Sequence, residues 1–432
     1  MKENKTQVIV VGGGPAGISA AITIAKSGKE VILIERGNFS GSKNMFGGAI
    51  YTQPTKEIFP DFEKTAPLER NNIKHNYTIL TETDSTTVTY RDNTPHSNSY
   101  SVIRSKFDRW LAEEAKKAGV ILVTQTVVKE LILKKKKVIG VKTELEDYYA
   151  DIVILADGVN SLLARQIGLR KDFSPKNVAL GIKEVYKIGQ EKINERFNLK
   201  DNEGCITEFF GYPMLGELGL GYMYTNKDTV TLGLGITLSE LIKTKIKPYE
   251  LLDKLKNHQS ISPFIEGGEL LEYSAHLIPE GGYKSIPKLY ADGVMIVGDS
   301  ACLVNNLHWE GTNLAMISGK FAGETAIIAI NKNDFTKRTL SLYKKKLDKS
   351  FVIADMKSYK DLMDIMHKNS KSFLNYYLRK INKFFKMFIE VDSIAKRNKF
   401  RNFIFTTLKE RGLSGLLKDG LNVLKLVWGI LK

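Results

Sequence analysis

The sequence predicts an α/β protein in three parts: a Rossmann-type dinucleotide-binding domain, an inserted antiparallel β-sheet substrate domain, and a helical C-terminal region. Three observations predict it. A glycine-rich turn joins a strand to a helix and a second strand at the N-terminus, apolar and polar residues alternate from about 172 to 275, and a lysine-rich segment without turn clusters follows residue 331. The expected domain boundaries are 1–75, 100–171 and 276–330 for the first domain, 76–99 and 172–275 for the second, and 331–432 for the third.

The N-terminal segment carries a dinucleotide-binding fingerprint. QVIVV predicts a strand, GGGPAG follows, an alanine-rich helix comes next, and VILIE predicts a second strand that ends at Glu35. Gly12 would permit the tight turn, Gly14 would let a pyrophosphate approach the backbone, and Gly17 would let helix and strand pack closely. The helix N-terminus would bind the phosphates, and Glu35 would accept hydrogen bonds from a ribose. The contacts expected here are Gly12, Gly14, Pro15, Ala16, Gly17, Glu35 and Arg36.

A glycine-rich loop, GSKNMFGGAIY at 41–51, follows this unit. It has two interpretations. One is a surface Ω-loop. The other is a loop laid against a flat ring, in which Gly47 and Gly48 permit close approach and Lys43 offers a donor. Position in the sequence does not decide between them.

The next segments predict a helix and a β-meander. Residues 100–119 predict a strand end and an amphipathic helix, with Arg104 just before the helix. Judged by its position alone, Arg104 is more typical of an arginine in contact with solvent than of one in contact with a ligand. Residues 120–156 alternate like a meander, with KKKK at 134–137 as its turn, and no aromatic residues interleave with these lysines to indicate a nucleic-acid site. Within and after the meander, the expected contacts are Val127, Asp157 and Gly158.

A late strand predicts the other half of the site. GVMIVGDSA, which starts at Gly293, predicts a last parallel strand ending at Asp299. Ligands of dinucleotide folds lie beyond the carboxyl ends of the strands, so Asp299 is placed to bond a hydroxyl group of the ligand. A helix then begins at Gly-Thr-Asn, and its N-terminus would stabilise negative charge on a bound ring. The contacts expected here are Asp299, Gly311, Thr312 and Asn313.

Composition limits the partners and the compartment. The net charge is +16, and residues 371–432 hold 14 Lys and Arg against 4 Asp and Glu, a net +10 of that total. This tail indicates an anionic partner, and from Leu413 its apolar residues recur at helical spacing. Two cysteines, Cys205 and Cys302, are too few for a four-thiolate iron–sulfur cluster. No export signal and no apolar stretch of about 18 residues is visible, so we expect a cytoplasmic protein without a spanning helix.

These motifs resemble an FAD-dependent family that includes aromatic hydroxylases, geranylgeranyl reductases and electron-transfer flavoprotein:quinone oxidoreductases. The shared features are the GxGxxG start, ADG at 156–158 and GD at 298–299, in that order. SKNMFGGAIY, AHLIPEGG and GDSACLVNNLHWEGTNLAMISGK are most similar to the FixC branch of the quinone oxidoreductases. The resemblance covers about residues 5–330 and continues less specifically to the end. It implies a Rossmann-type FAD-binding domain of the GR2 kind.

The resemblance also implies an activity and partners. It implies one bound FAD and an oxidoreductase that takes electrons from an electron-transfer flavoprotein and passes them towards quinone or a small ferredoxin-like iron–sulfur protein. Longer members carry their own four-cysteine iron–sulfur domain, which this chain lacks, as expected for the FixC branch. The basic C-terminal helix indicates peripheral contact with the inner face of the cell membrane. No metal site and no nucleic-acid partner are implied.

The resemblance likewise assigns residues. Gly12, Gly14, Gly17 and Glu35 match the family's FAD phosphate and ribose site, Arg104 matches the arginine before its R-x-x-F-D helix, and Asp299, Gly311 and Thr312 match its flavin-facing segment. A His308–Glu310 pair beside a flavin could move protons, although a loop-anchoring role is favoured. Cys302 is interpreted as a small buried packing residue. We therefore assign no catalytic residue.

Three other functions stay open. A geranylgeranyl-reductase-like enzyme would reduce prenyl double bonds and would need a long apolar tunnel in the 172–275 domain. An FAD-dependent monooxygenase would couple NAD(P)H oxidation to oxygen, and the absence of a second GxGxxG unit disfavours it without excluding it. The last is an FAD-binding scaffold without turnover of its own.

Overall fold

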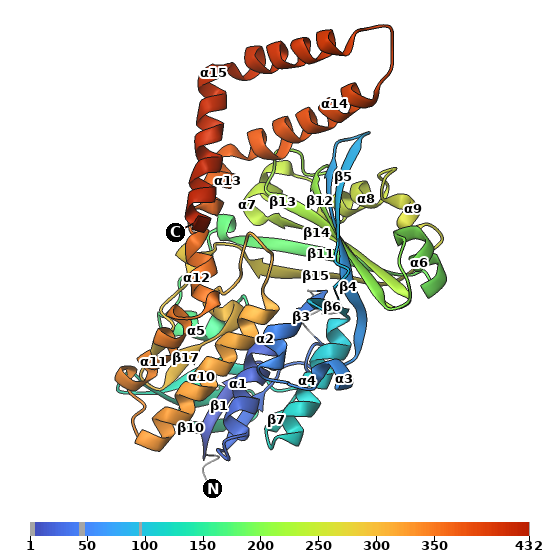
Figure 1. The fold of residues 1–432 in the computed structure, drawn as a ribbon. Coiled ribbons are helices and arrows are strands. Elements are labelled where there is room, and N and C mark those ends of the chain that lie inside the picture. The colour runs from blue at the N-terminus through green and yellow to red at the C-terminus, as the bar shows by residue number, and fades with distance from the viewer. Residues whose placement is uncertain (1–4, 43–47, 95–96, 432) are drawn as a thin grey trace.

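Two β-sheets and a group of C-terminal helices make up the chain in the computed structural model (Figure 1). The structure describes residues 5–42, 48–94 and 97–431. In Figure 1 the sheet that contains the N-terminal strand lies at the bottom, the second sheet lies above it, and the last helices extend beyond the second sheet. This is the α/β arrangement that the sequence predicts.

The first sheet is a Rossmann-type sheet. Its spatial order is β16-β17-β10-β1-β2-β7, in which β1, β2, β7, β10 and β17 are parallel, and an antiparallel pair, β8 and β9, extends from β10. The turn between β8 and β9 falls inside the KKKK run, as expected. The bounds are β1 Lys5–Val11, β2 Val31–Ile34, β7 Ile121–Val123, β8 Val128–Lys134, β9 Lys137–Thr143, β10 Asp147–Leu155, β16 Tyr290–Ala291 and β17 Val294–Ile296.

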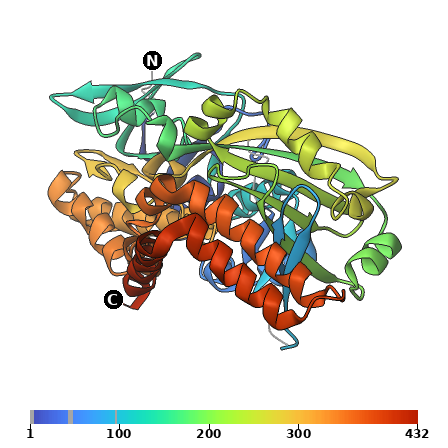
Figure 2. The ribbon, with the colours of Figure 1, turned by 90° about the horizontal axis from the view of Figure 1, so that it is seen from above.

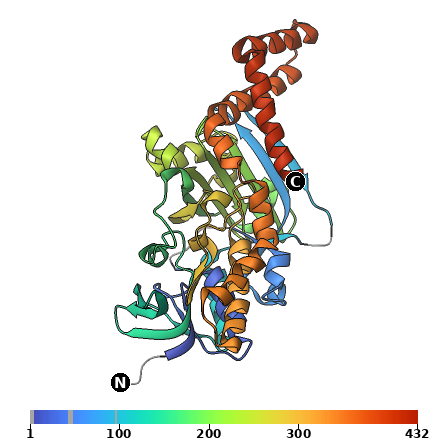
Figure 3. The ribbon, with the colours of Figure 1, turned by 90° about the vertical axis from the view of Figure 1, so that its left-hand side faces the viewer.

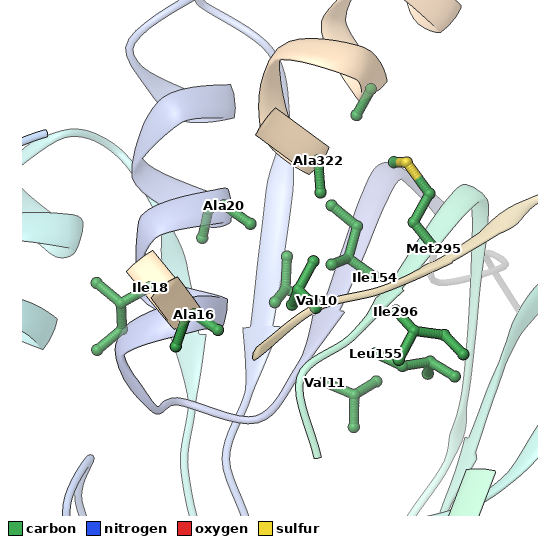
Figure 4. Packing of buried hydrophobic residues seen from close by; sticks show 14 of the residues in the cluster. Val10, Val11, Ala16, Ile18, Ala20, Ile154, Leu155, Met295, Ile296 and Ala322 are labelled. Carbon is green, nitrogen blue, oxygen red and sulfur yellow. The ribbon is translucent and has the colours of Figure 1, made fainter. Parts of the chain in front are cut away.

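The centre of this sheet is the main hydrophobic core. Val10, Ile154 and Ile296 on three neighbouring parallel strands are fully buried. Figure 4 shows them beside small residues of the covering helices. Consecutive residues of β1 and β10 are buried, so both faces of these strands are covered and they are apolar along their whole length rather than alternating, which is the pattern of VIVV and IVIL here.

Helices α1 and α10 pack closely on this sheet because small residues line their contact. A Cβ atom added at Gly319 would stand 2.0 Å from the carbonyl oxygen of Ala16, and one at Gly323 would stand 2.8 Å from that of Ala20. The close approach brings the N-termini of both helices to the same edge of the sheet. The helix bounds are α1 Pro15–Ala25, α4 Arg104–Lys117 and α10 Thr312–Lys332.

The second sheet follows the order β15-β11-β14-β13-β12-β4-β6-β3, with β5 paired to β4. It is antiparallel as predicted, except that β12 pairs with β4 in parallel. Strand pairing also brings 49–51, 68–75 and 100–102 into this sheet, although the expected boundaries assigned them to the first domain. The pairing joins segments far apart in the sequence, which no local pattern reveals. The bounds are β3 Ala49–Tyr51, β4 Leu68–Leu80, β5 Ser85–Arg91, β6 Ser99–Val102, β11 Val178–Lys187, β12 Glu203–Gly211, β13 Gly219–Thr225, β14 Thr229–Thr237 and β15 Glu269–Pro279.

The two faces of the second sheet have different surroundings. Cys205 and Phe209 of β12 belong to an apolar cluster with α6 and α8, whereas Ile206 and Phe210 point to the opposite side, where a cavity lies. The period of two along a strand thus divides the residues into a core face and a cavity face. Helices α6 Gln190–Phe197, α7 Leu238–Thr244, α8 Pro248–Lys256 and α9 Ser262–Ile265 belong to this half. The short helices α2 Thr52–Lys56, α3 Phe62–Thr65 and α5 Leu162–Gln166 lie nearer the first sheet.

The C-terminal region is helical, as predicted. A short π-helical segment, Ser372–Tyr376, joins α13 to α14. Figures 1 and 3 show α14 and the first part of α15 projecting from the body, and Figure 2 shows these two helices side by side. Their common base is attached to the β4–β5 turn, where Arg379 contacts Glu82 through two hydrogen bonds of 2.7 and 2.6 Å. The bounds are α11 Lys337–Asp348, α12 Phe351–Ser358, α13 Leu362–Lys371, α14 Tyr377–Ile389 and α15 Lys396–Leu431.

Helix α15 bends at Gly412, where φ is +69°. Beyond the bend it returns to the body and packs against α12 so closely that a Cβ atom at Gly429 would stand 2.5 Å from the carbonyl oxygen of Ser358. Arg411 and Asp419, on opposite sides of the bend, form two hydrogen bonds of 2.6 and 2.8 Å. Tyr377 of α14 donates to the same carboxylate at 2.7 Å.

Candidate functional site

One cavity of about 1110 Å³ is lined by residues of both sheets and of the C-terminal helices. It begins at the turn after β1, passes the carboxyl ends of β10 and β17, and continues along the cavity face of β12 and β13. Among the residues expected to contact a cofactor, those that line it are Gly12, Gly14, Pro15, Ala16, Glu35, Arg36, Gly48, Arg104, Val127, Asp157, Gly158, Asp299, Gly311, Thr312 and Asn313. Gly17 is not among the lining residues, and Lys43 and Gly47 lie outside the described residues.

The three glycines of the first turn have different surroundings. A Cβ atom at Gly12 would stand 2.2 Å from the carbonyl oxygen of Ala156, and one at Gly17 would stand 1.9 Å from that of Gly12. These two glycines therefore allow backbone segments to touch. A Cβ atom at Gly14 would meet nothing within 4 Å, because Gly14 faces the cavity at the N-terminus of α1. The absent side chain leaves room for a ligand.

Glu35 stabilises this turn. Its carboxylate accepts hydrogen bonds from the backbone N–H groups of Gly13 at 2.7 Å and Gly37 at 2.6 Å. Glu35 also lines the cavity, where its remaining lone pairs could accept a ribose hydroxyl. At Gly48 the described neighbour is a protein ring, because a Cβ atom there would stand 2.5 Å from the ring of Tyr224.

Arg104 is held by a buried ion pair. Its guanidinium donates to Asp108 from Nε at 2.8 Å and from Nη2 at 2.9 Å, and its Nη1 donates to Oγ1 of Thr312 at 3.4 Å. Arg104 and Asp108 are 4% and 0% exposed, so the pair has little contact with water. Asp108 thus fixes the orientation of an arginine that lines the cavity.

The carboxyl ends of β10 and β17 each lead to a carboxyl group, Asp157 and Asp299. The pKa of Asp299 lies above its usual range because burial outweighs the nearby guanidinium groups of Arg104 and Arg170. Asp157 accepts hydrogen bonds from Ser300 Oγ at 2.9 Å and from the backbone N–H of Leu163 at 3.4 Å. Asp157 therefore ties two loops together.

The first turn of α10 faces the same cavity. Gly311 precedes the helix, Thr312 and Asn313 begin it, and Oδ1 of Asn313 is buried with no hydrogen-bond partner among the described residues. The open space at Gly14 and the N-terminus of α1 fit a pyrophosphate at one end of a ligand. The N-terminus of α10 and the unpaired amide oxygen fit a ring with hydrogen-bonding groups at the other end. The residues present therefore fit a flavin dinucleotide.

The other half of the cavity was not predicted from the sequence. It is mostly apolar, and α13 and α15 cover part of it. It also holds two carboxyl groups, Glu208 and Glu280, whose pKa values burial raises to about 7. Sequence reasoning missed the lining residues Tyr51, His75, Tyr77, Ile206, Glu208, Phe210, Tyr222, Tyr224, His276, Glu280, Leu362, Met363, Met366, Leu374 and Leu426. The alternation in ITEFF and LGYMY was the available signal, but it does not show which face meets a ligand.

The loop before α10 lies at the boundary between the two halves. His308, Trp309 and Glu310 all line the cavity. His308 Nε2 lies 3.5 Å from the hydroxyl of Tyr359, and Glu310 exchanges backbone hydrogen bonds with Asn305 at 2.9 and 3.3 Å. These contacts hold the loop in place.

The two cysteines are separate and buried. Cys205 lies on the core face of β12, and Cys302 follows the end of β17, where burial raises its pKa to about 11. In the described ranges, no group of three or more His, Cys, Asp or Glu side chains could hold a metal ion.

Comparison with known proteins identifies the class. Residues 5–186 match a family model described as an FAD binding domain. Together with the fold and the cavity, this match defines an FAD-dependent flavoprotein oxidoreductase, and the predicted cofactor is confirmed. Residues 178–278 match a model described as ETF-QO, ubiquinone-binding, and residues 362–428 match the ETF-QO/FixC family C-terminal domain. The chain belongs to the electron-transfer flavoprotein:quinone oxidoreductase/FixC family, as the resemblance indicated.

Full-length relatives support this membership. Protein FixC of Bradyrhizobium diazoefficiens is 42% identical over 426 residues, which cover 97% of this chain and 98% of that protein. Protein FixC of Azotobacter vinelandii is 43% identical, with coverage of 95% and 96%. The probable electron transfer flavoprotein-quinone oxidoreductase YdiS of Escherichia coli is 38% identical, with coverage of 98% and 99%.

Solved structures of lower identity share the fold. A geranylgeranyl bacteriochlorophyll reductase-like protein from Thermoplasma acidophilum superposes with a TM-score of 0.74 at 20% identity, covering 88% of this chain and 91% of that one. The myxobacterial chondrochloren halogenase, an FAD-dependent enzyme, has a TM-score of 0.65 at 15% identity, with coverage of 95% and 91%. The predicted fold class is thereby confirmed.

Proposed function

We propose that this flavoprotein accepts electrons from an electron-transfer flavoprotein and passes them to a quinone or to a small ferredoxin-like iron–sulfur protein. The observation that carries the proposal is the single cavity that joins the FAD end to an apolar end. The apolar end is built largely by residues 178–278, the segment that matches the ubiquinone-binding model. A quinone ring and its isoprenoid tail have the chemistry that this end would accept.

When bound, FAD supplies the electron transfer, and the protein supplies binding, orientation and exclusion of water. The N-terminus of α1 would hold the pyrophosphate, Glu35 the ribose, and Asp299 the ribityl chain. The N-terminus of α10 would stabilise negative charge on the ring. We propose as FAD contacts the expected residues that line the cavity, from Gly12 to Asn313.

The test compares electron donors on the purified holoprotein under anaerobic conditions. Flavin absorbance is followed with NAD(P)H, with a reduced electron-transfer flavoprotein and with dithionite, and a short-tailed ubiquinone analogue is then added. The proposal expects rapid reduction by the electron-transfer flavoprotein and reoxidation by the quinone analogue. If only dithionite reduced the flavin, the protein would be an FAD-binding scaffold without turnover, and the proposal would be wrong.

A second function is favoured by the apolar walls of the cavity. Leu362 and Met363 of α13 and Leu426 of α15 extend the lining beyond the second sheet, which would suit a prenyl chain as a substrate to be hydrogenated. The same preparation distinguishes the two functions. A prenyl reductase would saturate double bonds of a geranylgeranyl substrate, detected by mass spectrometry, and quinone would not reoxidise its flavin rapidly.

We further propose that α14 and the first part of α15 contact an anionic membrane surface. Among the described residues, none of the helices combines the length and apolar character that a bilayer crossing requires. Phe384, Phe400 and Phe403 pack against one another inside the helical pair, with ring centroids 5.9 to 6.0 Å apart. Phe388 and Phe405, however, are 59% and 66% exposed. Exposed aromatic residues on a basic helical pair suit the headgroup boundary.

We expect a Phe388→Asp/Phe405→Asp double variant to bind anionic vesicles at least about tenfold more weakly than the unchanged chain, because each phenylalanine contributes about 1.5–3 kcal/mol when buried. Co-sedimentation at low and high salt measures this, and high salt should weaken binding of the unchanged chain. Leu133→Asp/Leu145→Asp is the matched control, because these residues are 50% and 77% exposed and lie on β8 and in the β9–β10 turn of the other sheet. Equal binding of both double variants would contradict the proposal.

A further inference from the structure

Glu208 places a carboxyl group in the apolar half of the cavity. It lies on the cavity face of β12 between Ile206 and Phe210, which line the cavity on either side of it. In the sheet, Glu208 stands in register with Tyr77 of β4 and with Tyr222 of β13. Residues in register share a face, so the carboxyl group is flanked by two phenol rings.

The surroundings of Glu208 provide no cation. The titratable groups that face it from the neighbouring elements are Tyr51, His75, Tyr77, Tyr222, Tyr224 and Glu310. Burial lowers the pKa of His75, so this imidazole is mainly neutral. Burial alone raises the pKa of Glu208 to about 7. Burial raises the pKa of Tyr51 and Tyr224, and the charge on Glu208, where present, raises both further.

Packing does not explain this carboxyl group. Its Oε2 atom is buried and has no hydrogen-bond partner among the described residues. Two other buried glutamates of this half have partners: Glu184 of β11 contacts Lys256 at 3.3 Å, and Glu240 of α7 contacts Lys243 at 2.8 Å. A buried polar group without a partner destabilises a fold, so a leucine would serve stability better. Buried ionisable side chains that destabilise the fold in this way are typical of functional sites.

We infer that Glu208 is the proton donor to a carbonyl oxygen of the quinone, an inference that rests on the proposed function. Reduction of a quinone to a hydroquinone needs two electrons and two protons. The reduced flavin provides the electrons. Glu208 gives one proton to a quinone oxygen, which forms an O–H bond and leaves a carboxylate on β12. The carboxylate is then reprotonated from solvent, which also takes up the proton that the flavin loses on oxidation and supplies the second proton to the other quinone oxygen.

The route from solvent to this carboxyl group passes Tyr77. Its ring is in register with Glu208 on the neighbouring strand, and the residue is 46% exposed. A hydroxyl group that reaches both water and the cavity can exchange protons with a carboxylate beside it. Glu208 is thus placed to pass protons between solvent and a ligand in the cavity.

The test uses the holoprotein and a short-tailed ubiquinone analogue. The dissociation constant of the analogue is measured by calorimetry from about pH 5.5 to about pH 9, together with the rate of quinone reduction. In the unchanged protein, the protonated carboxyl group donates a hydrogen bond to the analogue. Binding should therefore weaken as the pH rises through about 7, where the carboxyl group loses its proton. In Glu208→Gln this weakening should be much smaller, because an amide does not titrate in this range and only the other carboxyl group of this half of the cavity, Glu280, still titrates near pH 7.

The rate of quinone reduction should fall about 100-fold or more in Glu208→Gln, while flavin reduction by the donor stays unchanged. Glu208→Asp should recover part of the rate. Glu217→Gln is the matched control, because the pKa of Glu217 is also about 7, but its side chain does not line the cavity. It should keep the pH dependence of the unchanged protein.

The outcomes separate this inference from the proposed function. If the unchanged protein neither binds nor reduces the quinone analogue, both the proposed function and the role of Glu208 are wrong. If the unchanged protein reduces quinone but Glu208→Gln shows the same pH dependence of binding, only the role of Glu208 is wrong. If the variant fails to fold, the unchanged protein decides: a dissociation constant that does not vary with pH overturns the inference.

Discussion

Replacing Gly14 by valine should abolish FAD binding and leave the polypeptide folded. The backbone at Gly14 has φ of −82° and ψ of 179°, which a valine can adopt, and a Cβ atom there would meet no protein atom within 4 Å. The added side chain would instead occupy the part of the cavity where α1 would hold the pyrophosphate. We expect FAD affinity to fall at least about 100-fold, or about 2.7 kcal/mol. Visible absorbance and calorimetric titration with FAD measure the loss, and circular dichroism measures the fold.

Controls make this result specific. Gly420→Val adds the same side chain at another position where a Cβ atom meets nothing within 4 Å, on the distant α15, and should keep its FAD. Gly17→Val should instead prevent folding, because its Cβ atom would stand 1.9 Å from a backbone oxygen. A Gly14→Val protein with full yellow absorbance would show that the pyrophosphate is not held here.

Replacing Asp108 by alanine should lower the free energy of unfolding by about 3–5 kcal/mol, the typical cost of breaking a buried ion pair. The guanidinium of Arg104 would lose the carboxylate that it contacts through two hydrogen bonds, although both side chains are almost fully buried. Denaturant unfolding monitored by fluorescence measures the change. FAD should also bind more weakly, because Asp108 orients Arg104 towards the cavity.

A control pair lies on the same helix. Glu113 and Lys116 of α4 form a salt bridge of 2.8 Å, but their side chains are 60% and 48% exposed. Glu113→Ala should therefore change stability by less than about 1 kcal/mol. An Arg104→Met/Asp108→Leu double variant should recover most of the stability lost in Asp108→Ala, since it removes both charges together. An equal effect of Glu113→Ala and Asp108→Ala would contradict the burial argument.

The parts of the fold and the site that could be predicted depend on local sequence. The strand, turn and helix around Gly12 to Gly17 lie within a short segment, and Glu35 ends the next strand, so spacing alone indicated them. Asp299 and Thr312 could be found because a parallel strand and the next helix meet at one sheet edge. The KKKK turn was equally local.

The apolar half of the cavity could not be predicted because it depends on pairing between distant segments. Glu208 meets Tyr77 only because β12 pairs with β4 in parallel, across 131 positions of the chain. The sequence shows that Glu208 alternates with apolar neighbours, but it does not show which strand lies beside β12. Likewise, nothing in the spacing of Leu413 and its successors indicates that Leu426 lines the cavity. Asp108 was missed because an i, i+4 carboxylate on a helix is usually exposed.

The bend in α15 connects the projecting helices to the wall of the cavity. Phe405 lies before Gly412 and faces solvent, whereas Leu426 lies after it and lines the cavity. Asp419, after the bend, accepts hydrogen bonds from Arg411, before the bend, and from Tyr377 of α14. These contacts restrain the angle of the bend. A surface that binds the projecting helices would therefore lie at the angle to the cavity that this bend sets.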